Sequence, residues 1–152
     1  MKILLAVDGS SFSDAAVEEV ATRSWPEGSE LRIVSAIEPL SFPTSEAWVP
    51  PDNYIVALEK AAQERARSIV NEAAERVQTL QRDKLRITRE VATGHPKHVI
   101  LSDAESWPAD LIVVGSHGYR GLTRLWLGSV SQAVASHAKC SVEIVRAPSL
   151  AA

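Results

Sequence analysis

The residues best suited to binding chemistry lie in the segment 115–129, which reads GSHGYRGLTRLWLGS. Its glycines stand at 115, 118, 121 and 128, between an apolar strand-like run and a helix-like one. Glycine lets the backbone adopt positive φ and approach a ligand closely, and the amides at a helix start can donate to an anion beside the Ser129 hydroxyl. The helix dipole adds ~0.3–1 kcal/mol there. The pattern predicts a phosphate-binding loop, with an ordinary glycine-rich surface loop as the alternative.

The spacing of these glycines differs from two familiar phosphate motifs. A P-loop needs GxxxxGK followed by Ser or Thr, and no such lysine follows these glycines. The first apolar run is likewise not followed by GxGxxG. What remains is GxxGx9GS, with the apolar positions of a helix after it, and this order favours a binding site over chance composition.

Composition places the chain among globular proteins of one domain, residues 1–152. The hydrophobic fraction is 45%, and 16 Lys and Arg against 19 Asp and Glu give a net charge of −3. A broad basic face for nucleic acid is therefore not expected. The first apolar run is too short to span a bilayer, so we expect neither a signal peptide nor a membrane anchor. Cys140 is the single cysteine, which excludes an intrachain disulfide and makes the cytoplasm the expected compartment; a buried thiol without chemical function is favoured there.

Strand-like runs alternate with helical patterns along the whole chain. Short apolar runs bounded by turn residues predict strands at 2–7, 31–37, 85–91, 110–115 and 142–145. Helical spacing predicts helices beginning near Ser11, Ile55, Pro96 and Ser129, the first with a capping box of Ser11 and Asp14. The order βαβαβαβαβ predicts an α/β fold in which helices cover both faces of a parallel sheet. Ligands of such folds bind beyond the carboxyl ends of the strands.

Two further segments have a distinct pattern. Residues 39–52 contain four prolines with Phe42 and Trp48, so neither a strand nor a helix continues through them, and we regard them as a candidate lid. Apolar residues from 55 to 80 then recur at steps of three and four, which predicts one long amphipathic helix. Its charged face is expected to be solvated, with pairs such as Glu72 and Arg76.

The motif Gly115-Ser-His-Gly118, nine residues, then Gly128-Ser129 resembles the nucleotide-binding signature of the universal stress protein family. Val7-Asp8-Gly9-Ser10, Thr93-Gly94-His95-Pro96 and the terminal Val-Glu-Ile-Val-Arg strand also resemble the family, so the likeness covers essentially the full chain. The resemblance implies the single-domain, ATP-binding type with the adenine nucleotide alpha hydrolase-like, Rossmann-like fold. It further implies a five-stranded parallel sheet of order 3-2-1-4-5 and a homodimer that pairs through the last strand, 142–146.

The same resemblance implies site residues. It assigns the nucleoside to residues at the ends of the first two strands, namely Ala6, Asp8 and Ala36. It assigns the ribose and phosphates to the glycine-rich segment, namely Gly115, Gly118, Gly128, Ser129, Val130 and Ser131. Ser116, His117 and Arg120 are secondary candidates. The implied ligand is ATP, or AMP or ADP, with Mg²⁺ or Mn²⁺ held mainly by phosphates and water; no dedicated protein metal site is expected.

Several of these residues have a simpler structural interpretation. Asp8 and Ser129 are also ordinary helix caps, and His117 and Arg120 are equally typical of a solvent-facing loop. The adjacent Ser116 and His117 lack an orienting carboxylate, so no catalytic residue is predicted. His95 and His98 lack a clear third ligand for a metal.

The favoured function is that of an ATP-binding stress or regulatory protein, in which nucleotide biases the dimer or residues 39–52 toward binding an unidentified protein partner. A slow ATP hydrolase is the main alternative, although no catalytic base is identified. A module for cyclic AMP or another adenylate, and a nucleotide-independent interaction domain, remain open.

Overall fold

The computed structural model describes residues 1–41, 51–82, 84–118 and 127–147, and these contain one parallel sheet. Its strands follow the apolar runs of the sequence: β1 (Lys2–Ala6), β2 (Glu30–Ile37), β3 (Arg86–Thr93), β4 (Leu111–Gly115) and β5 (Ser141–Val145). The strand order is β3-β2-β1-β4-β5, and every neighbouring pair is parallel. The predicted α/β fold and strand order are confirmed.

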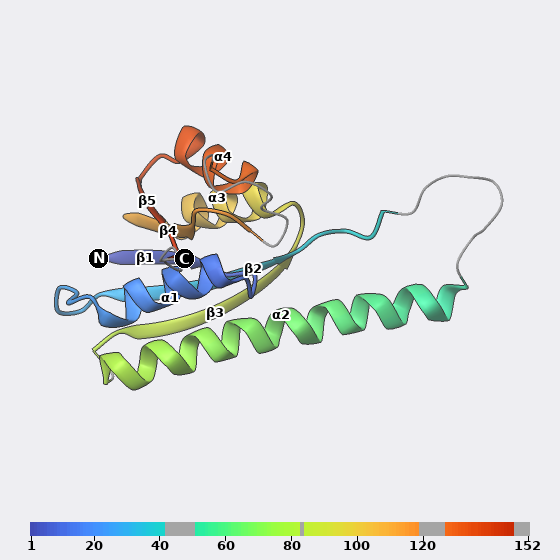
Figure 1. Ribbon diagram of the computed structural model, residues 1–152, viewed down its shortest axis with the longest axis horizontal. Coiled ribbons are helices and arrows are strands. Elements are labelled where there is room, and N and C mark those ends of the chain that lie inside the picture. The colour runs from blue at the N-terminus through green and yellow to red at the C-terminus, as the bar shows by residue number, and fades with distance from the viewer. Residues whose placement is uncertain (42–50, 83, 119–126, 148–152) are drawn as a thin grey trace, which may run out of the picture.

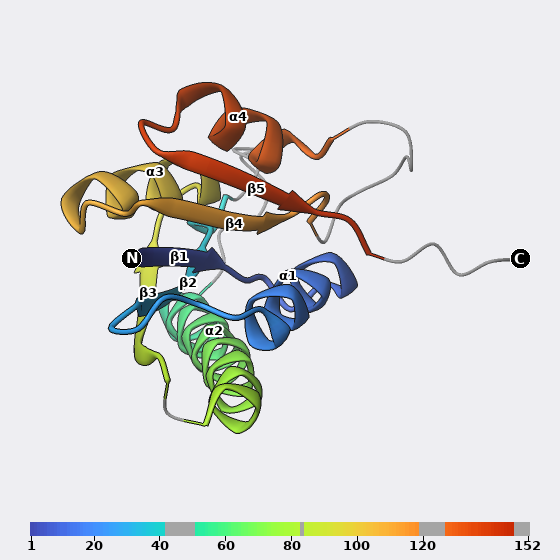
Figure 2. The same cartoon turned by 90° about the vertical axis from the view of Figure 1, so that its left-hand side faces the viewer.

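Helices cover both faces of this sheet, as Figure 2 shows in a view along its edge. In the described residues they are α1 (Ser11–Thr22), α2 (Asp52–Gln81), α3 (Pro96–Ser106) and α4 (Ser129–His137). The helices α1 and α2 lie on one face, while α3 and α4 lie on the other. All four begin within three residues of the predicted starts.

The central strand β1 explains why two helical layers form. Its side chains alternate between the faces, so Ile3 and Leu5 join the core under α1 and α2, whereas Leu4 joins the core under α3 and α4. All three side chains are fully buried. A strand buried on both faces has a continuous apolar sequence, which is the pattern of residues 3–7.

The strands end at a common edge because the sheet is parallel. Ala6 at the end of β1 pairs with Val34 of β2, and Gly115 at the end of β4 pairs with Val145 of β5. The segments that follow β1 and β4 therefore begin at the same side of the sheet. This carboxyl edge is where the predicted site residues are gathered.

The start of α1 differs by one residue from the predicted capping box. Ser10 is the N-cap, and its hydroxyl oxygen accepts from the amide of Ser13 at 3.2 Å. The box of Ser11 and Asp14 was therefore wrong, because Ser11 already has helical geometry as the first residue of α1. Both serines are capping residues by type, and the turn geometry selects Ser10.

The helix α2 is 30 residues long and extends beyond the sheet in Figure 1. Its buried residues begin only at Ala66. The predicted pair of Glu72 and Arg76 does not match the contacts, because Arg76 reaches across to α1 and forms an ion pair with Glu18 at 2.7 Å. This pair joins the two helices that share a face.

The last turn of α1 is capped by a side chain from the end of α2. The amide nitrogen of Gln81 lies 2.7 Å from the carbonyl of Ala21, 2.8 Å from that of Arg23 and 3.3 Å from that of Val20. Gln81 is only 6% exposed, so solvent does not replace these bonds. The side chain of Arg23 links this end of α1 to β5, because its guanidinium donates a hydrogen bond to Glu143. That hydrogen bond raises the pKa of the Arg23 guanidinium.

Replacing this cap tests its contribution. We expect Gln81→Leu to lower the free energy of unfolding by about 1–3 kcal/mol, because buried carbonyls lose their donor. Urea denaturation followed by circular dichroism measures the change. Gln63→Leu, at an exposed position of the same helix, is the control and should change stability far less. Equal stability of the two variants would contradict the capping function.

Candidate functional site

The two halves of the glycine-rich motif contact each other at the carboxyl edge. The amide of Gly128 donates to the carbonyl of Ser116 at 2.8 Å. The Ser131 hydroxyl lies 2.9 Å from the same carbonyl and 2.9 Å from that of Gly128, and Ser131 is 2% exposed. Ser131 therefore braces the loop from within, and its predicted phosphate contact stays a prediction.

Gly115 is where the first turn of α1 packs against the end of β4. A Cβ at this position would lie 2.6 Å from both the carbonyl carbon and the carbonyl oxygen of Phe12. Such a distance is not compatible with a side chain, so glycine is needed for the packing of backbone on backbone. Sequence reasoning missed Phe12, whose only signal was an aromatic residue at the start of a helix next to the site.

Asp8 and Gly118 are brought together although they are far apart in the sequence. One carboxylate oxygen of Asp8 accepts from the amide of Ser10 at 2.9 Å, which stabilises the turn after β1. A Cβ at Gly118 would lie 3.0 Å from the other oxygen, Oδ2. Asp8 thus has the local turn-forming function and also presents an oxygen at the loop.

His117 lies between the loop and α1. Its ring centroid is 5.0 Å from that of Phe12, and its Nδ1 lies 3.2 Å from the hydroxyl oxygen of Ser116. Its Nε2 is buried and, within the described residues, has no hydrogen-bond partner. Ser116 itself is 2% exposed and its amide donates to the carbonyl of Val145 at 2.7 Å, which fixes the loop to β5. A buried ring nitrogen without a partner leaves one polar group of the loop unsatisfied.

Within the described residues, the helix α4 begins at the loop without a side-chain cap. Its N-cap is Gly128, so the alternative in which Ser129 is only the N-cap is wrong: Ser129 is the first helical residue and is exposed. Val130 packs its side chain against the core under α3 and α4, and only its amide can serve a ligand. Uncapped amides in the first turn of a helix are suitable donors for an anion.

The remaining predicted residues lie at the ends of neighbouring strands. Ala6 ends β1, and Ala36 stands two residues after Val34, the β2 residue that pairs with Ala6. Both alanines are half-buried. They share the carboxyl edge with Asp8, and their predicted contacts with the nucleoside stay a prediction.

Two predictions concern residues outside the described ranges. Arg120, a secondary candidate, lies in the undescribed segment 119–126, and residues 42–50 of the candidate lid are also outside the described part. These predictions remain untested.

Other candidate chemistry receives no support from the geometry. Among the described residues, no three or more His, Cys, Asp or Glu side chains are grouped to hold a metal ion. His95 is the N-cap of α3, and its ring centroid lies 6.3 Å from that of His98. Burial raises the pKa of the Cys140 thiol, which disfavours the reactive thiolate. No helix of the described ranges has the length and apolar character needed to cross a membrane.

Comparisons with known proteins agree with this architecture. Residues 1–146 match the model of the Universal stress protein family. The universal stress protein Sll1388 of Synechocystis is 31% identical over 152 residues, with 95% of this chain and 97% of the relative covered. Among solved structures, universal stress protein UspA from Lactobacillus plantarum superposes with a TM-score of 0.78 at 28% identity, covering 96% of this chain and 97% of that one.

Two more distant structures contain adenylates. A universal stress protein family protein from Arabidopsis thaliana has AMP bound; it is 16% identical, with a TM-score of 0.68 and coverage of 98% of this chain and 93% of that one. A universal stress protein in complex with cAMP is 24% identical, with a TM-score of 0.65 and 97% of each chain covered. At these identities the likeness shows the fold.

The contact at Gly115 can be tested by a single methyl group. We expect Gly115→Ala to lower the free energy of unfolding by about 1–3 kcal/mol, because the added Cβ overlaps the backbone of Phe12. The overlap is mainly with backbone, so Phe12→Ala should not relieve it, and the cost should be similar in both backgrounds. Urea denaturation of the unmodified protein, the two single variants and the double variant measures the effect. Full rescue by Phe12→Ala would contradict the close backbone approach.

Proposed function

The chain belongs to the universal stress protein family, and on this premise we propose that it binds an adenine nucleotide, ATP above all, at the carboxyl edge of the sheet. The observation that carries the proposal is the convergence of two kinds of group on one loop. The Asp8 carboxylate lies beside Gly118, and the uncapped first turn of α4 begins at Gly128. A carboxylate accepts from ribose hydroxyls, while helix-start amides donate to phosphates.

The loop also has a polar group that lacks a partner. The buried Nε2 of His117 has no hydrogen bond within the described residues, and this leaves a free-energy cost in the chain without ligand. In the tautomer that carries the proton on Nε2, this nitrogen would donate to a phosphate oxygen once binding shifts the atoms that bury it. The residues present therefore fit a nucleotide: a carboxylate for the ribose, amides and the Ser129 hydroxyl for the phosphates, and alanines for the flat base.

Hydrogen bonds fix the two described ends of the glycine-rich loop in position. Ser131 and Gly128 fix the loop to Ser116, and Ser116 is bonded to β5. Binding groups at these two ends of the loop that already have fixed positions lose less conformational entropy when the ligand arrives. When bound, Mg²⁺ or Mn²⁺ would supply positive charge to the phosphates, which would hold it together with water.

The adenylate relatives support the ligand class. One of these relatives has AMP bound and the other is in complex with cAMP. Because both share the fold of this chain, they support an adenylate as its ligand. Of the adenylates, ATP is our first choice because the glycine spacing resembles the signature of the ATP-binding type. Cyclic AMP is the alternative, and it differs by using one phosphate where ATP would use three.

The biological function proposed is regulation in the cytoplasm, with nucleotide occupancy as the signal. Among the described strands, β5 is at the edge of the sheet, and we propose that a second copy pairs with it through residues 142–146. On the inner side, Arg23 binds Glu143 through two contacts of 2.7 and 2.6 Å, which fixes the strand against α1. A fixed edge strand is suited to a homodimer in which nucleotide binding favours one state over another.

Binding is tested by calorimetry with ATP, AMP, cAMP and adenosine, after extraction of any co-purified nucleotide. We expect Ser129→Asp to weaken ATP and AMP roughly tenfold or more, since its carboxylate repels the phosphates, an effect of about 1.4 kcal/mol or greater. Adenosine should lose much less. The variant should remain folded because an acidic residue is favourable in the first turn of a helix.

The control is Ser102→Asp, which adds the same charge at an exposed position of α3. Its nucleotide affinities should equal those of the unmodified protein. The proposal is overturned if no adenylate binds and none is extracted, or if both variants lose affinity equally.

We expect binding without appreciable hydrolysis. The hydroxyl of Ser116 is buried beside His117, and the two carboxylate oxygens of Asp8 are assigned to the turn and to the ribose, so we propose neither side chain as the base for water. The measurement is phosphate release by the purified protein and by Gly118→Val, with Ser102→Asp as control. Release that disappears only in Gly118→Val would establish a slow ATP hydrolase instead.

A further inference from the structure

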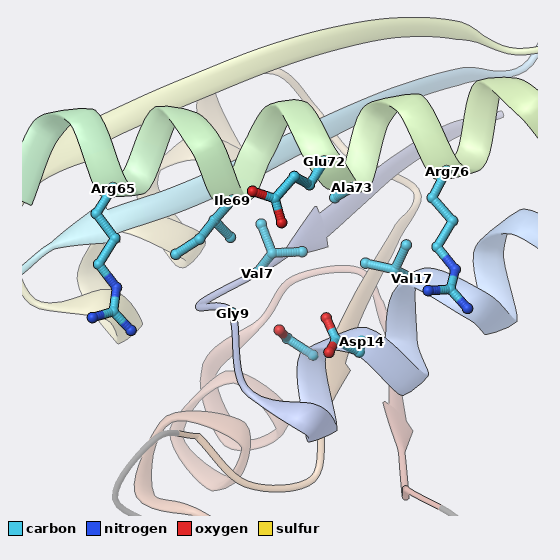
Figure 3. Close-up of a pocket in the computed structure, with 10 residues that line it drawn as sticks. Val7, Gly9, Asp14, Val17, Arg65, Ile69, Glu72, Ala73 and Arg76 are labelled. Atoms are coloured by element: carbon cyan, nitrogen blue, oxygen red, sulfur yellow. The ribbon is translucent and has the colours of Figure 1, made fainter.

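A cavity of about 290 Å³ lies between α1 and α2, on the face of the sheet that does not carry α4. Its floor is formed by apolar side chains: Val7 after β1, Val17 of α1, and Ile69 and Ala73 of α2 (Figure 3). Val7, Val17 and Ala73 are buried, at 5%, 3% and 6% exposure. The volume is just below the range of small-molecule pockets, roughly 300–1,000 Å³, so only a small ligand would fit.

This cavity and the glycine-rich loop lie on opposite sides of one segment of the chain, residues 7–14. Val7, Gly9 and Ser13 line the cavity. Asp8 and Phe12, which lie between them in the sequence, instead contact Gly118 and Gly115 of the loop. The cavity is therefore separate from the proposed nucleotide site, and the two share a wall.

The charged side chains around the cavity indicate which sign of charge a ligand would carry. Arg76 is paired with Glu18 through two contacts, at 2.7 and 2.8 Å, so its charge is compensated by a residue outside the lining. The other charged lining residues are Asp14, Glu72 and Arg65, two carboxylates against one guanidinium. An excess of negative charge beside an apolar floor favours a cation with an apolar body.

The two carboxylates come from different helices. Figure 3 shows Glu72 of α2 and Asp14 of α1 directed into the space between the helices. Glu72 is oriented by Ser68, whose hydroxyl donates to one of its oxygens at 2.7 Å. A group that donates several hydrogen bonds, such as a primary ammonium, can bind carboxylates on both sides.

From this arrangement we propose that the cavity is a second ligand site, specific for a small primary amine with an apolar chain. The ammonium binds Asp14 and Glu72, and the methylene groups lie on Val7, Val17 and Ala73. The site is independent of the proposed nucleotide function, because none of these contacts involves the glycine-rich loop.

Hexylamine is the probe, with hexanoate and hexanol as ligands of the same chain length. Methyl resonances of Val17, Ile69 and Ala73 are followed by nuclear magnetic resonance during titration. We expect saturable shifts with hexylamine and roughly tenfold weaker binding, or none, with hexanoate and hexanol, since a lost charge-assisted contact is worth about 1.4 kcal/mol.

Variants then locate the amine. Glu72→Gln, an exposed and conservative change, should weaken hexylamine about tenfold, whereas Glu75→Gln on the same helix lies outside the cavity and should have no effect. Ala73→Leu should fill the cavity and abolish the shifts. Its fold is checked by circular dichroism, and Glu72→Gln decides the question if that variant is unfolded.

Four results would overturn the proposal, and the first three concern hexylamine binding alone. They are shifts that do not saturate, equal binding of hexanoate, and equal affinities of Glu72→Gln and Glu75→Gln. Displacement of hexylamine by AMP at a shared site would also overturn it, because the amine would then occupy the nucleotide pocket. Failure of AMP to bind at all would instead affect only the nucleotide function.

Discussion

The carboxyl edge of this protein depends on the contact between the backbone of Phe12 and Gly115. No side chain fits at position 115, since a Cβ would lie 2.6 Å from the Phe12 carbonyl group. A second glycine has the matching function on the other side: Gly9, with a φ of +76°, would place a Cβ 3.0 Å from Ile69 of α2. The turn after β1 and the start of α1 therefore lie between β4 and α2 at two positions that favour glycine: Gly115 for the close backbone contact, and Gly9 for its positive φ beside Ile69.

This arrangement makes one short segment, residues 7–14, a wall for two different environments. On the loop side, polar groups meet: Asp8 is beside Gly118, and Ser116 is bonded through its carbonyl to Gly128. On the α2 side, Val7 contributes to an apolar floor. Alternation of side chains along an extended strand end, followed by the first helical turn, is sufficient to separate them. The two proposed sites therefore lie on opposite sides of this segment, and a shift of the segment would affect both.

The sequence was sufficient for the elements and for the motif, because both depend on local patterns. The apolar run of β1 predicts a buried strand, and the spacing from Gly115 to Ser129 predicts a loop that enters a helix. What could not be predicted depends on tertiary contacts. Arg76 has suitable partners one turn away on its own helix, yet Glu18 of α1 lies nearer in the fold. Likewise Val17 and Ile69 have the periodicity of ordinary core residues, and only packing leaves space between them.

The environments of Ser116, Ser129 and Ser131 favour the proposed nucleotide binding over nucleotide hydrolysis. Ser131 is buried and bonded to two carbonyls, and Ser116 is buried beneath the loop, so both hydroxyls contribute to its shape. Only Ser129 remains exposed at the start of α4. The described ends of the loop, with the exposed Ser129 hydroxyl and the first-turn amides of α4, can hold an anion, whereas hydrolysis also needs a base that orients water. The same bonds that fix the described ends of the loop thus withdraw the hydroxyls of Ser116 and Ser131 from chemistry, which favours the proposed nucleotide binding over nucleotide hydrolysis.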